Sequence, residues 1–254
     1  MLLQPLPALT DNYIWTLTDS EHRAVIVDPG EAAPVSRATD TGIRPAAILL
    51  THHHHDHIGG TAELLQRWPG TPVFAPADDR IDLPCQRVGE GDRVDLGDWH
   101  FDVLGLPGHT LSHIAFVGNG NLFCGDTLFS LGCGRLFEGT PAQMLTSLDK
   151  LARLPPSTRV CCGHEYTLAN AEFAGAVDPD NAALRKRANA AVALRDAGRP
   201  TLPAILSDEL ASNPFLRVDA DPIRDAITGY LGHAPSDRIE TFAALRAWKD
   251  GFRA

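Results

Sequence analysis

The stretch that decides the fold reads AAILLTHHHHDH and occupies residues 46–57. In it, an apolar, strand-like run leads into a cluster that holds five of the chain's eleven histidines. If the strand continues into the cluster, His52 and His54 share one face, because side chains two positions apart in a strand point the same way. Asp56 and His57 then lie beyond the turn and can point elsewhere. Two groups of ligands that face two directions are what a pair of adjacent metal ions requires, so the run predicts a metal centre.

Three further ligand-type residues follow strand-like runs in the same manner. His109 stands in LGLPGHT, Asp126 in NLFCGDT and His164 in RVCCGHE, each directly after a glycine that lets the backbone turn tightly. Ligand-binding residues of α/β sheets gather at the carboxyl ends of strands, so we expect these side chains to join the first group. A single histidine after a strand is more often a surface or core residue, but that explanation does not suit seven such residues at four strand ends. Imidazole and carboxylate without thiolate suit zinc, and also iron or manganese.

The rest of the first 164 residues alternates short β-like runs with turns and helices. The expected strands are rich in Val, Ile, Leu and Phe, and Gly, Pro or Asp bounds them. They are YIWTLT, AVIVDPG, AAILLTH, PVFAP, WHFDVLGLPGH, HIAFVG, NLFCGD and RVCCGH. Two helices are expected here, TAELLQRW after the histidines and PAQMLTSLDKLARL before RVCC. Strands with helices between them predict a layered α/β core.

The pattern becomes helical in the last third of the chain. DNAALRKRANAAVALRDAG has apolar residues at helical spacing and ends on Gly198, a residue type that commonly follows a helix. SDRIETFAALRAWKD offers Ser236 or Asp237 as its cap, and Glu240 completes a capping-box pattern from Asp237. The expected domains are a metal-binding one, residues 1–164, and an all-α one, residues 165–254.

Composition argues against several classes of function. The chain has 254 residues and a net charge of −10, so general binding to nucleic acid is not expected. Apolar runs fall short of the roughly 18–20 residues that span a bilayer, and the N-terminus MLLQPLPALTDNY lacks the segments of a secretory signal. We therefore expect a cytoplasmic protein without a membrane partner. Its five cysteines are then reduced thiols, and Cys161 and Cys162, in an apolar run, are expected to be core residues.

The run THHHHDH at residues 51–57 resembles the signature T-H-x-H-x-D-H of the metallo-β-lactamase superfamily. More narrowly, the chain is similar to glyoxalase II, the family of hydroxyacylglutathione hydrolases, over essentially its whole length. The matching segments are DNYIW, VDPG, THHHHDHIGG, LPGHT, GDTLF, GCGRLFEGT, CCGHEYT, NPFLR and RAWKD. The signature marks the superfamily alone, whereas GHEYT, NPFLR and RAWKD are more specific to the narrower family. The resemblance implies an αββα sandwich followed by a small helical domain that binds substrate.

The resemblance also implies two metal ions per chain, zinc before iron or manganese. The implied ligands of one ion are His52, His54 and His109, and those of the other are Asp56, His57 and His164. Asp126 would bridge the two ions, together with a hydroxide that attacks the substrate. His53 and His55 fill the variable positions of the signature and are not expected to be ligands. The expected catalytic residues are therefore Asp56 and Asp126.

The implied substrate is S-D-lactoylglutathione, which a monomeric enzyme would cleave to D-lactate and glutathione in methylglyoxal detoxification. Members of the family bind the glutathione carboxylates through basic residues and tyrosines. The corresponding positions here are Arg135, Phe137, Tyr166, Arg246 and Lys249. Arg135 stands where many members have lysine, and Phe137 where some have tyrosine, so one phenol hydrogen bond would be missing. Arg246 and Lys249 lie three apart on an expected helix, so they can share a face and grip one anionic group.

Two questions stay open at the level of sequence. A persulfide dioxygenase with a single iron, or another hydrolase of the superfamily such as a lactonase, would carry the same signature. The helical C-terminal segment with Arg246 and Lys249 favours the glutathione thioester over the dioxygenase. Asp28, in AVIVDPG, fits equally well as a turn residue and as a partner for the N–H of a metal-binding histidine.

Overall fold

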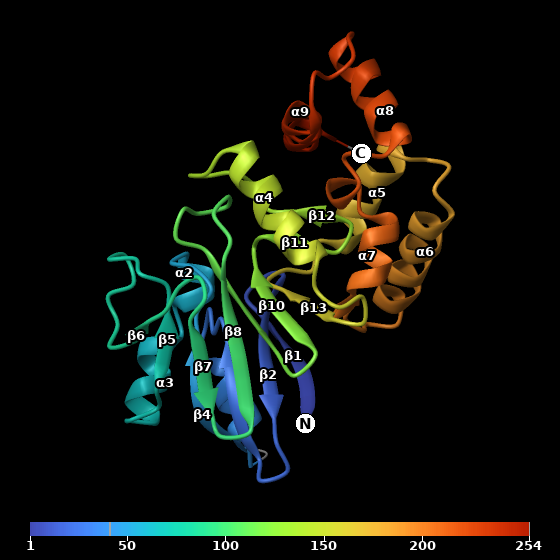
Figure 1. Ribbon diagram of the computed structural model, residues 1–254. Coiled ribbons are helices and arrows are strands. Elements are labelled where there is room, and N and C mark those ends of the chain that lie inside the picture. Colours follow the sequence, from blue (N-terminus) through green and yellow to red (C-terminus); the bar gives the residue numbers. More distant parts are fainter. Residues whose placement is uncertain (41, 254) are drawn as a thin grey trace. The chain divides into compact units, whose positions relative to one another are not determined.

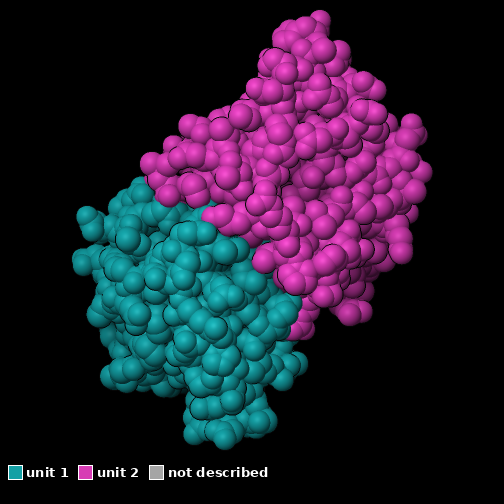
Figure 2. All heavy atoms as spheres, in the orientation of Figure 1, with its two compact units in different colours: residues 1–106, 112–125, 161–164 teal, residues 107–111, 126–160, 165–254 magenta. Residues whose placement is uncertain are grey.

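The computed structural model describes residues 1–40 and 42–253 (Figure 1). The chain forms two compact units, which Figure 2 colours separately. Unit 1 comprises residues 1–106, 112–125 and 161–164, and unit 2 comprises residues 107–111, 126–160 and 165–254. Within the described residues, no helix combines the length and the apolar character needed to cross a membrane.

The first sheet of unit 1 changes from antiparallel to parallel along its width. Its strands, in chain order and in spatial order, are β1 (Leu2–Ala8), β2 (Asn12–Thr18), β3 (Arg23–Val27), β4 (Arg44–Leu49), β5 (Val73–Ala75) and β6 (Gln86–Arg87). The strands β1, β2 and β3 pair antiparallel, whereas β3, β4, β5 and β6 pair parallel. Parallel strands end at one edge, so the residues that follow β3 and β4 emerge side by side.

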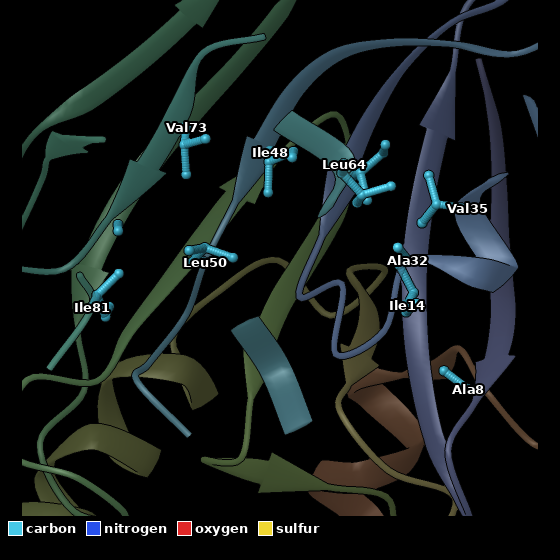
Figure 3. Close-up of a cluster of buried hydrophobic side chains, with 11 residues drawn as sticks. Ala8, Ile14, Ala32, Val35, Ile48, Leu50, Leu64, Val73 and Ile81 are labelled. Atoms are coloured by element: carbon cyan, nitrogen blue, oxygen red, sulfur yellow. The ribbon is translucent and has the colours of Figure 1, made fainter. Parts of the chain in front are cut away.

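Three helices of unit 1 connect strands of this sheet. They are α1 (Ala33–Asp40), α2 (His55–Ile58) and α3 (Thr61–Arg67). Val35 of α1 and Leu64 of α3 belong to one buried cluster with Ile14, Ile26 and Ile48 of the sheet (Figure 3). Burying an aliphatic side chain of this size stabilises the fold by about 1.5–3 kcal/mol, so this cluster fixes both helices on the sheet.

The second sheet of unit 1 packs on the first. Five of its six strands are, in spatial order, β13 (Arg159–Cys162), β10 (Asn121–Gly125), β9 (Ile114–Gly118), β8 (Trp99–Gly105) and β7 (Arg93–Leu96). All seven residues of β2 are buried, as expected for a strand that is covered on both faces. Trp15 of β2 donates its Nε1–H to the carbonyl of Cys162 in β13 over 2.9 Å, which joins the two sheets. Cys161 and Cys162 are free and buried, so their prediction as core residues is confirmed.

Unit 2 is mainly helical. Its helices are α4 (Pro141–Ala152), α5 (Thr167–Val177), α6 (Ala182–Asp196), α7 (Leu206–Ser212), the 3-10 turn η1 (Pro214–Leu216), α8 (Asp221–Leu231) and α9 (Arg238–Gly251). The short strands β11 (Leu128–Phe129) and β12 (Gly132–Cys133) form a hairpin, and β14 (Ala204–Ile205) pairs with Arg159 and Val160. The ring of Phe173 contacts the rings of Phe215, Trp248 and Phe252, which ties α5 to the last helix.

All eight expected strands and all four expected helices are present, and their predicted ends are confirmed in part. Asp237 caps α9 by accepting the N–H of Glu240 over 2.8 Å, and Gly198, with φ of 68°, follows α6. The expectation that the strand continues to His52 and His54 is wrong, because β4 ends at Leu49. The carbonyl of His54 accepts the N–H of His57 over 2.9 Å, so the chain turns into α2 immediately after the second ligand.

Candidate metal centre

Unit 1 brings five of the seven predicted ligands together beyond the ends of β4 and β13. His52 Nε2 lies 3.1 Å from His54 Nδ1, and His57 Nε2 lies 3.4 Å from His164 Nε2. Asp56 Oδ2 lies 3.5 Å from His57 Nε2 and 3.4 Å from His164 Nε2. The ligand atoms of Asp56, His57 and His164 all lie within 4.8 Å of one another, a spacing that one metal ion can span. His52, His57 and His164 are buried, so water competes little for their ring nitrogens.

Three of these histidines have an oxygen partner on the ring nitrogen that faces away from the other ligands. His57 Nδ1 lies 3.0 Å from Asp28 Oδ2, and His164 Nδ1 lies 2.7 Å from Asp11 Oδ1. His52 Nδ1 lies 3.0 Å from the hydroxyl of Thr51. A carboxylate in this position accepts the N–H of the imidazole, so the opposite nitrogen directs a lone pair into the cluster. Facing lone pairs repel one another unless a cation or proton lies between them, and the residues therefore fit a bound metal ion.

Asp28 orients a ligand and also makes the turn after β3. Its Oδ1 accepts the backbone N–H of Thr51 over 2.8 Å, and its Oδ2 accepts the Thr51 hydroxyl over 2.7 Å beside His57. Asp28 also lies close enough to His52 and His57 for the three to hold one metal ion, with ligand atoms within 4.8 Å of one another. However, the N–H and the hydroxyl of Thr51 already donate to its two oxygens. Its φ of 52° and the bond from the N–H of Gly30 to its carbonyl show the turn. Asp28 therefore both forms the turn and contacts the ring nitrogen of a histidine that is predicted to bind metal.

Two residues of the site were not anticipated as such: Asp11, in the turn between β1 and β2, and Asn12, the first residue of β2. Asn12 Nδ2 donates to Asp56 Oδ2 over 3.0 Å and to the Asp56 carbonyl over 3.2 Å. Asp11 holds His164, as described above. The available signal was the segment DNYIW, in which two polar residues directly precede an apolar strand. Two polar residues at the start of a buried strand indicate side chains that form hydrogen bonds.

Gly30 allows α2 to approach the turn after β3. A Cβ atom at this position would lie 1.9 Å from the carbonyl oxygen of Asp56, which is inside any contact that atoms tolerate. Only glycine lets the backbone of the VDPG segment lie against the residue that carries Asp56. The placement of Asp56 and His57 thus depends on the absence of a side chain at Gly30.

Unit 2 holds the other two predicted ligands, His109 and Asp126. His109 Nε2 lies 3.4 Å from Asp126 Oδ2, and His109 Nδ1 donates to the carbonyl of Arg135 over 2.9 Å. This is the same arrangement as in unit 1, with one nitrogen held by an oxygen and the other directed toward a carboxylate. His109 stands in the loop that joins β8 to β9, and Asp126 directly follows β10, so each comes after a strand, as predicted.

Unit 2 contains three predicted substrate contacts whose side chains are at least partly exposed, Arg135, Phe137 and Tyr166. Phe137 is 63% exposed, and its ring centroid lies 5.2 Å from that of His109. Tyr166 directly precedes α5, and its ring lies against that of Phe129 at 5.2 Å. The guanidinium of Arg135 is exposed, with Nε 3.3 Å from Asp250. Phe137 thus lies beside a predicted ligand and exposes much of its ring.

Arg246 and Lys249 share a helix but not an environment. Arg246 is buried, and it donates from Nη1 to the carbonyl of Cys133 over 2.8 Å and from Nη2 to Asp250 over 3.0 Å. Lys249 donates from Nζ to the carbonyl of Ala169 over 2.9 Å, and burial lowers the pKa of its amine. Burial raises the pKa of the Cys133 thiol to about 11, so this cysteine remains a neutral thiol.

The fold and the histidine cluster define a class of protein. The family model described as metallo-beta-lactamase superfamily matches residues 13–164, and the chain belongs to that superfamily. A B3 metallo-beta-lactamase named BLEG-1 has a similar structure, with a TM-score of 0.65 and 23% identity over 85% of this chain and all of its own. ETHE1 from Myxococcus xanthus gives a TM-score of 0.66 with 24% identity over 96% of this chain and 90% of its own. Both likenesses support the expected αββα sandwich.

Within that superfamily, the chain belongs to the hydroxyacylglutathione hydrolase family, glyoxalase II. The model described as hydroxyacylglutathione hydrolase C-terminus matches residues 165–252. A hydroxyacylglutathione hydrolase of Xylella fastidiosa (strain M23) is 59% identical over 99% of this chain and 98% of its own. One of Xanthomonas axonopodis pv. citri (strain 306) is 58% identical over the whole of both chains. The chain is therefore a hydrolase, and a persulfide dioxygenase or a lactonase is not favoured.

Proposed function

We propose that this chain hydrolyses the thioester of S-D-lactoylglutathione to D-lactate and glutathione and so acts in methylglyoxal detoxification. The relatives that match its full length are named hydroxyacylglutathione hydrolase. The structural observation that carries the chemistry is the convergence of His52, His54, Asp56, His57 and His164, with the outward nitrogens of three of these histidines held by oxygen. Such a cluster serves metal-assisted hydrolysis, which the superfamily assignment supports.

We propose a binuclear metal centre. The proposed ligands of one ion are His52, His54 and His109, those of the other are Asp56, His57 and His164, and Asp126 is shared. Zinc is the first choice for this set of imidazoles and carboxylates, with iron or manganese as alternatives. One solved structure, TTHA1623 in a di-iron-bound form, is 32% identical over 65% of this chain, with a TM-score of 0.55. His109 and Asp126 join the set in this proposal because their chain segments follow strands of the second sheet.

The metal ions, when bound, lower the pKa of water to roughly 7 and stabilise negative charge on the thioester carbonyl oxygen. The residues of the chain supply position. The amide of Asn12 holds Asp56 by donating to its carboxylate and to its backbone carbonyl, so that the carboxylate can accept a hydrogen bond from the attacking water. Asp28 and Asp11 keep His57 and His164 in the tautomer with the proton on Nδ1. The leaving group is a thiolate, whose conjugate thiol has a pKa of about 8.5, so no dedicated general acid is needed.

We propose that Arg135, Phe137, Tyr166, Arg246 and Lys249 bind the glutathione part of the substrate. Exposed Phe137 offers an apolar face beside His109, and exposed Arg135 offers a cation. Bonds to Asp250 and to the carbonyl of Cys133 fix the guanidinium of Arg246, which in this proposal adds its positive charge to that of Lys249. Residues 1–164 would then form the catalytic domain and residues 165–254 the substrate-binding domain. A cytoplasmic monomer without nucleic-acid or membrane partners completes the proposal.

The decisive assay measures S-D-lactoylglutathione hydrolysis before and after chelation, with elemental analysis of the same sample. We expect activity that is lost with the metal and restored by Zn²⁺, and about two metal ions per chain. Asp126→Ala is expected to lose metal and turnover together. Two metal ions and near-normal turnover in Asp126→Ala would overturn the bridging role, and hydrolysis that survives complete chelation would overturn the proposed mechanism.

A further inference from the structure

The hairpin of unit 2 closes through a strained turn. Ser130 and Leu131 form the two-residue connection between β11 and β12. Leu131 has φ of 59°, in the left-handed region, where a residue other than glycine costs about 1–3 kcal/mol. Glycine or asparagine is the usual choice at such a position. Since the sequence places leucine there, the surroundings must hold the turn in this conformation.

Glu209 of α7 makes the central contacts to this turn. It is fully buried, and its Oε2 accepts the backbone N–H of Leu131 over 2.8 Å and the amide of Asn213 over 3.1 Å. Its Oε1 lies 2.6 Å from the hydroxyl of Ser130. Arg187 donates to that same hydroxyl oxygen from Nη2 over 2.9 Å and from Nε over 3.2 Å, which leaves the Ser130 hydrogen for Glu209. Burial raises the pKa of the Glu209 carboxyl, but every partner is a donor and so stabilises the carboxylate.

Two amides from helix ends complete the clamp on the turn. Asn213, at the end of α7, donates to the carbonyls of Phe129 and Gly132, each over 3.0 Å. Asn170 of α5 donates to the carbonyl of Ser130 over 3.1 Å. The four residues of the turn are thus bonded from α5, α6 and α7. Among these side chains, it is Glu209 that accepts the N–H of Leu131, whereas Asn170, Arg187 and Asn213 donate to the turn.

The open end of the same hairpin leads to one predicted metal ligand, Asp126, and is bonded to a second, His109. Asp126 stands two residues before β11, and Arg135 stands two residues after β12. The N–H of Gly134 donates to the carbonyl of Thr127 over 3.1 Å, and a Cβ at Gly134 would lie 1.9 Å from the Asp126 carbonyl. The carbonyl of Arg135 accepts from His109 Nδ1. A shift of the hairpin therefore moves Asp126 directly and His109 through its bond to Arg135.

We propose that Glu209 is a positioning residue for the metal centre: by fixing the Ser130–Leu131 turn, it sets where the hairpin presents Asp126 and His109. The inference rests on the proposed function, which makes those two residues metal ligands. Glu209 contacts the Ser130–Leu131 turn and not Asp126 or His109. Its effect on these two residues passes through β11 and β12. The left-handed conformation of Leu131 is strained, so weakening the bond that holds its N–H favours a rearrangement of the turn.

The test compares Glu209→Gln with Asp208→Asn. Glutamine keeps the volume and can still accept from Leu131, but it lacks the charge and the second acceptor for Ser130. Asp208, exposed on the same helix, loses the same charge without touching the hairpin. We expect the apparent dissociation constant for Zn²⁺, measured by competition with a chromogenic chelator, to rise about tenfold in Glu209→Gln and to stay unchanged in Asp208→Asn. The kcat at limiting Zn²⁺ falls in parallel, and excess Zn²⁺ restores most of it.

A purely structural role predicts a different result. Glu209→Gln would then unfold at a lower temperature but keep its Zn²⁺ affinity and kcat while folded, and that outcome overturns the inference. Asp126→Asn, measured in parallel, separates the two proposals. If it loses Zn²⁺ affinity and Glu209→Gln does not, only the inference fails; if it keeps wild-type affinity, the ligand set itself is wrong. Should Glu209→Gln fail to fold, Ser130→Ala, which leaves the bond to Leu131, is expected to weaken Zn²⁺ binding less, and unchanged binding in it overturns the proposal.

Discussion

At the scale of single residues, the predicted ligands are oriented by partners that are not themselves predicted to bind metal. Asp56 is half exposed, so its orientation comes from its hydrogen bonds rather than from packing. Asn12 supplies two of these bonds, one to the carboxylate and one to the carbonyl. Removal of a partner of this kind from a metal ligand typically weakens metal binding by 10–100-fold, because the ligand then samples other rotamers.

Asn12→Ala is therefore expected to bind Zn²⁺ about tenfold more weakly and to lose turnover in proportion at limiting metal. The measurement is a Zn²⁺ titration against a chelator, followed by kcat and KM for S-D-lactoylglutathione at each occupancy. Gln4→Ala, on the exposed side of the neighbouring strand β1, is the matched control and should behave as wild type. Unchanged Zn²⁺ binding in Asn12→Ala would show that Asp56 is held by other contacts.

A second residue, Asp78, makes stability depend on pH. Its buried carboxylate accepts from Arg80 Nε over 2.8 Å and from the Ser112 hydroxyl over 2.5 Å, and it lies 3.3 Å from His53 Nδ1. The hydrogen bonds from Arg80 hold the pKa of Asp78 well below its usual range. A depressed pKa in the folded state means that the carboxylate stabilises the fold above the unfolded pKa of about 3.9 and stops doing so as the pH falls through and below that value.

Asp78→Asn should thus lower the free energy of unfolding by about 1–2 kcal/mol at pH 7, and by progressively less as the pH falls from 5 to 3. Urea denaturation of the metal-free protein at several pH values measures the difference. Asp79→Asn, an exposed neighbour, serves as the control. A difference that stays constant down to pH 3 would mean that the side chain contributes through shape and not through its charge.

At the scale of elements, the sequence predicts those strands and helices whose apolar pattern and end residues are local in the chain. Strands such as β2 and β10 are continuous apolar runs between turn residues, and α9 carries its own cap at Asp237. Strand β1 was not predicted because Pro5 and Pro7 interrupt it, which an edge strand tolerates. Helix α2 was not predicted because four residues carry no helical period.

Some contacts that hold the site were not predicted from the sequence, for a different reason. His164 and its partner Asp11 are 153 residues apart in the chain, and Glu209 lies 78 residues from Leu131. Nothing in the local pattern around either partner encodes such a pairing, since it exists only once the sheets and helices have packed. The predicted ligands could be proposed from the sequence because their segments follow strand-like runs, so local pattern and position beyond the strand ends coincide.

The position of α2 depends on a single residue of another segment, Gly30, which the helix approaches closely. Gly30→Ala would place a methyl group 1.9 Å from the Asp56 carbonyl, so α2 must move away. We expect a loss of stability of about 1–3 kcal/mol from the forced shift and a marked loss of Zn²⁺ affinity, because Asp56 and His57 move with the helix. Gly89→Ala is the matched control, since a Cβ there meets nothing within 4 Å. Equal metal content in the two variants would contradict the role given to Gly30.

At the scale of the whole molecule, metal binding and folding are linked. The predicted ligands come from segments that are distant in the chain, so the unfolded chain cannot hold them in one place. A ligand that binds only the folded state stabilises it by RT ln(1 + [L]/Kd), which is about 2.7 kcal/mol at a hundredfold excess over Kd. The melting temperature of the wild-type protein should therefore rise steadily with free Zn²⁺.

This dependence separates the contribution of the metal from that of the protein scaffold. Thermal melting at a series of buffered Zn²⁺ concentrations is expected to give a linear rise of stability with the logarithm of free Zn²⁺ above Kd. In His57→Ala the dependence should weaken strongly, because one proposed ligand is lost, whereas in Gln4→Ala it should remain. His57 also packs against Asp28, so the metal-free variant melts lower than metal-free wild type, and only the slope against Zn²⁺ reports on the ligand role. A wild-type slope in His57→Ala would remove this residue from the ligand set.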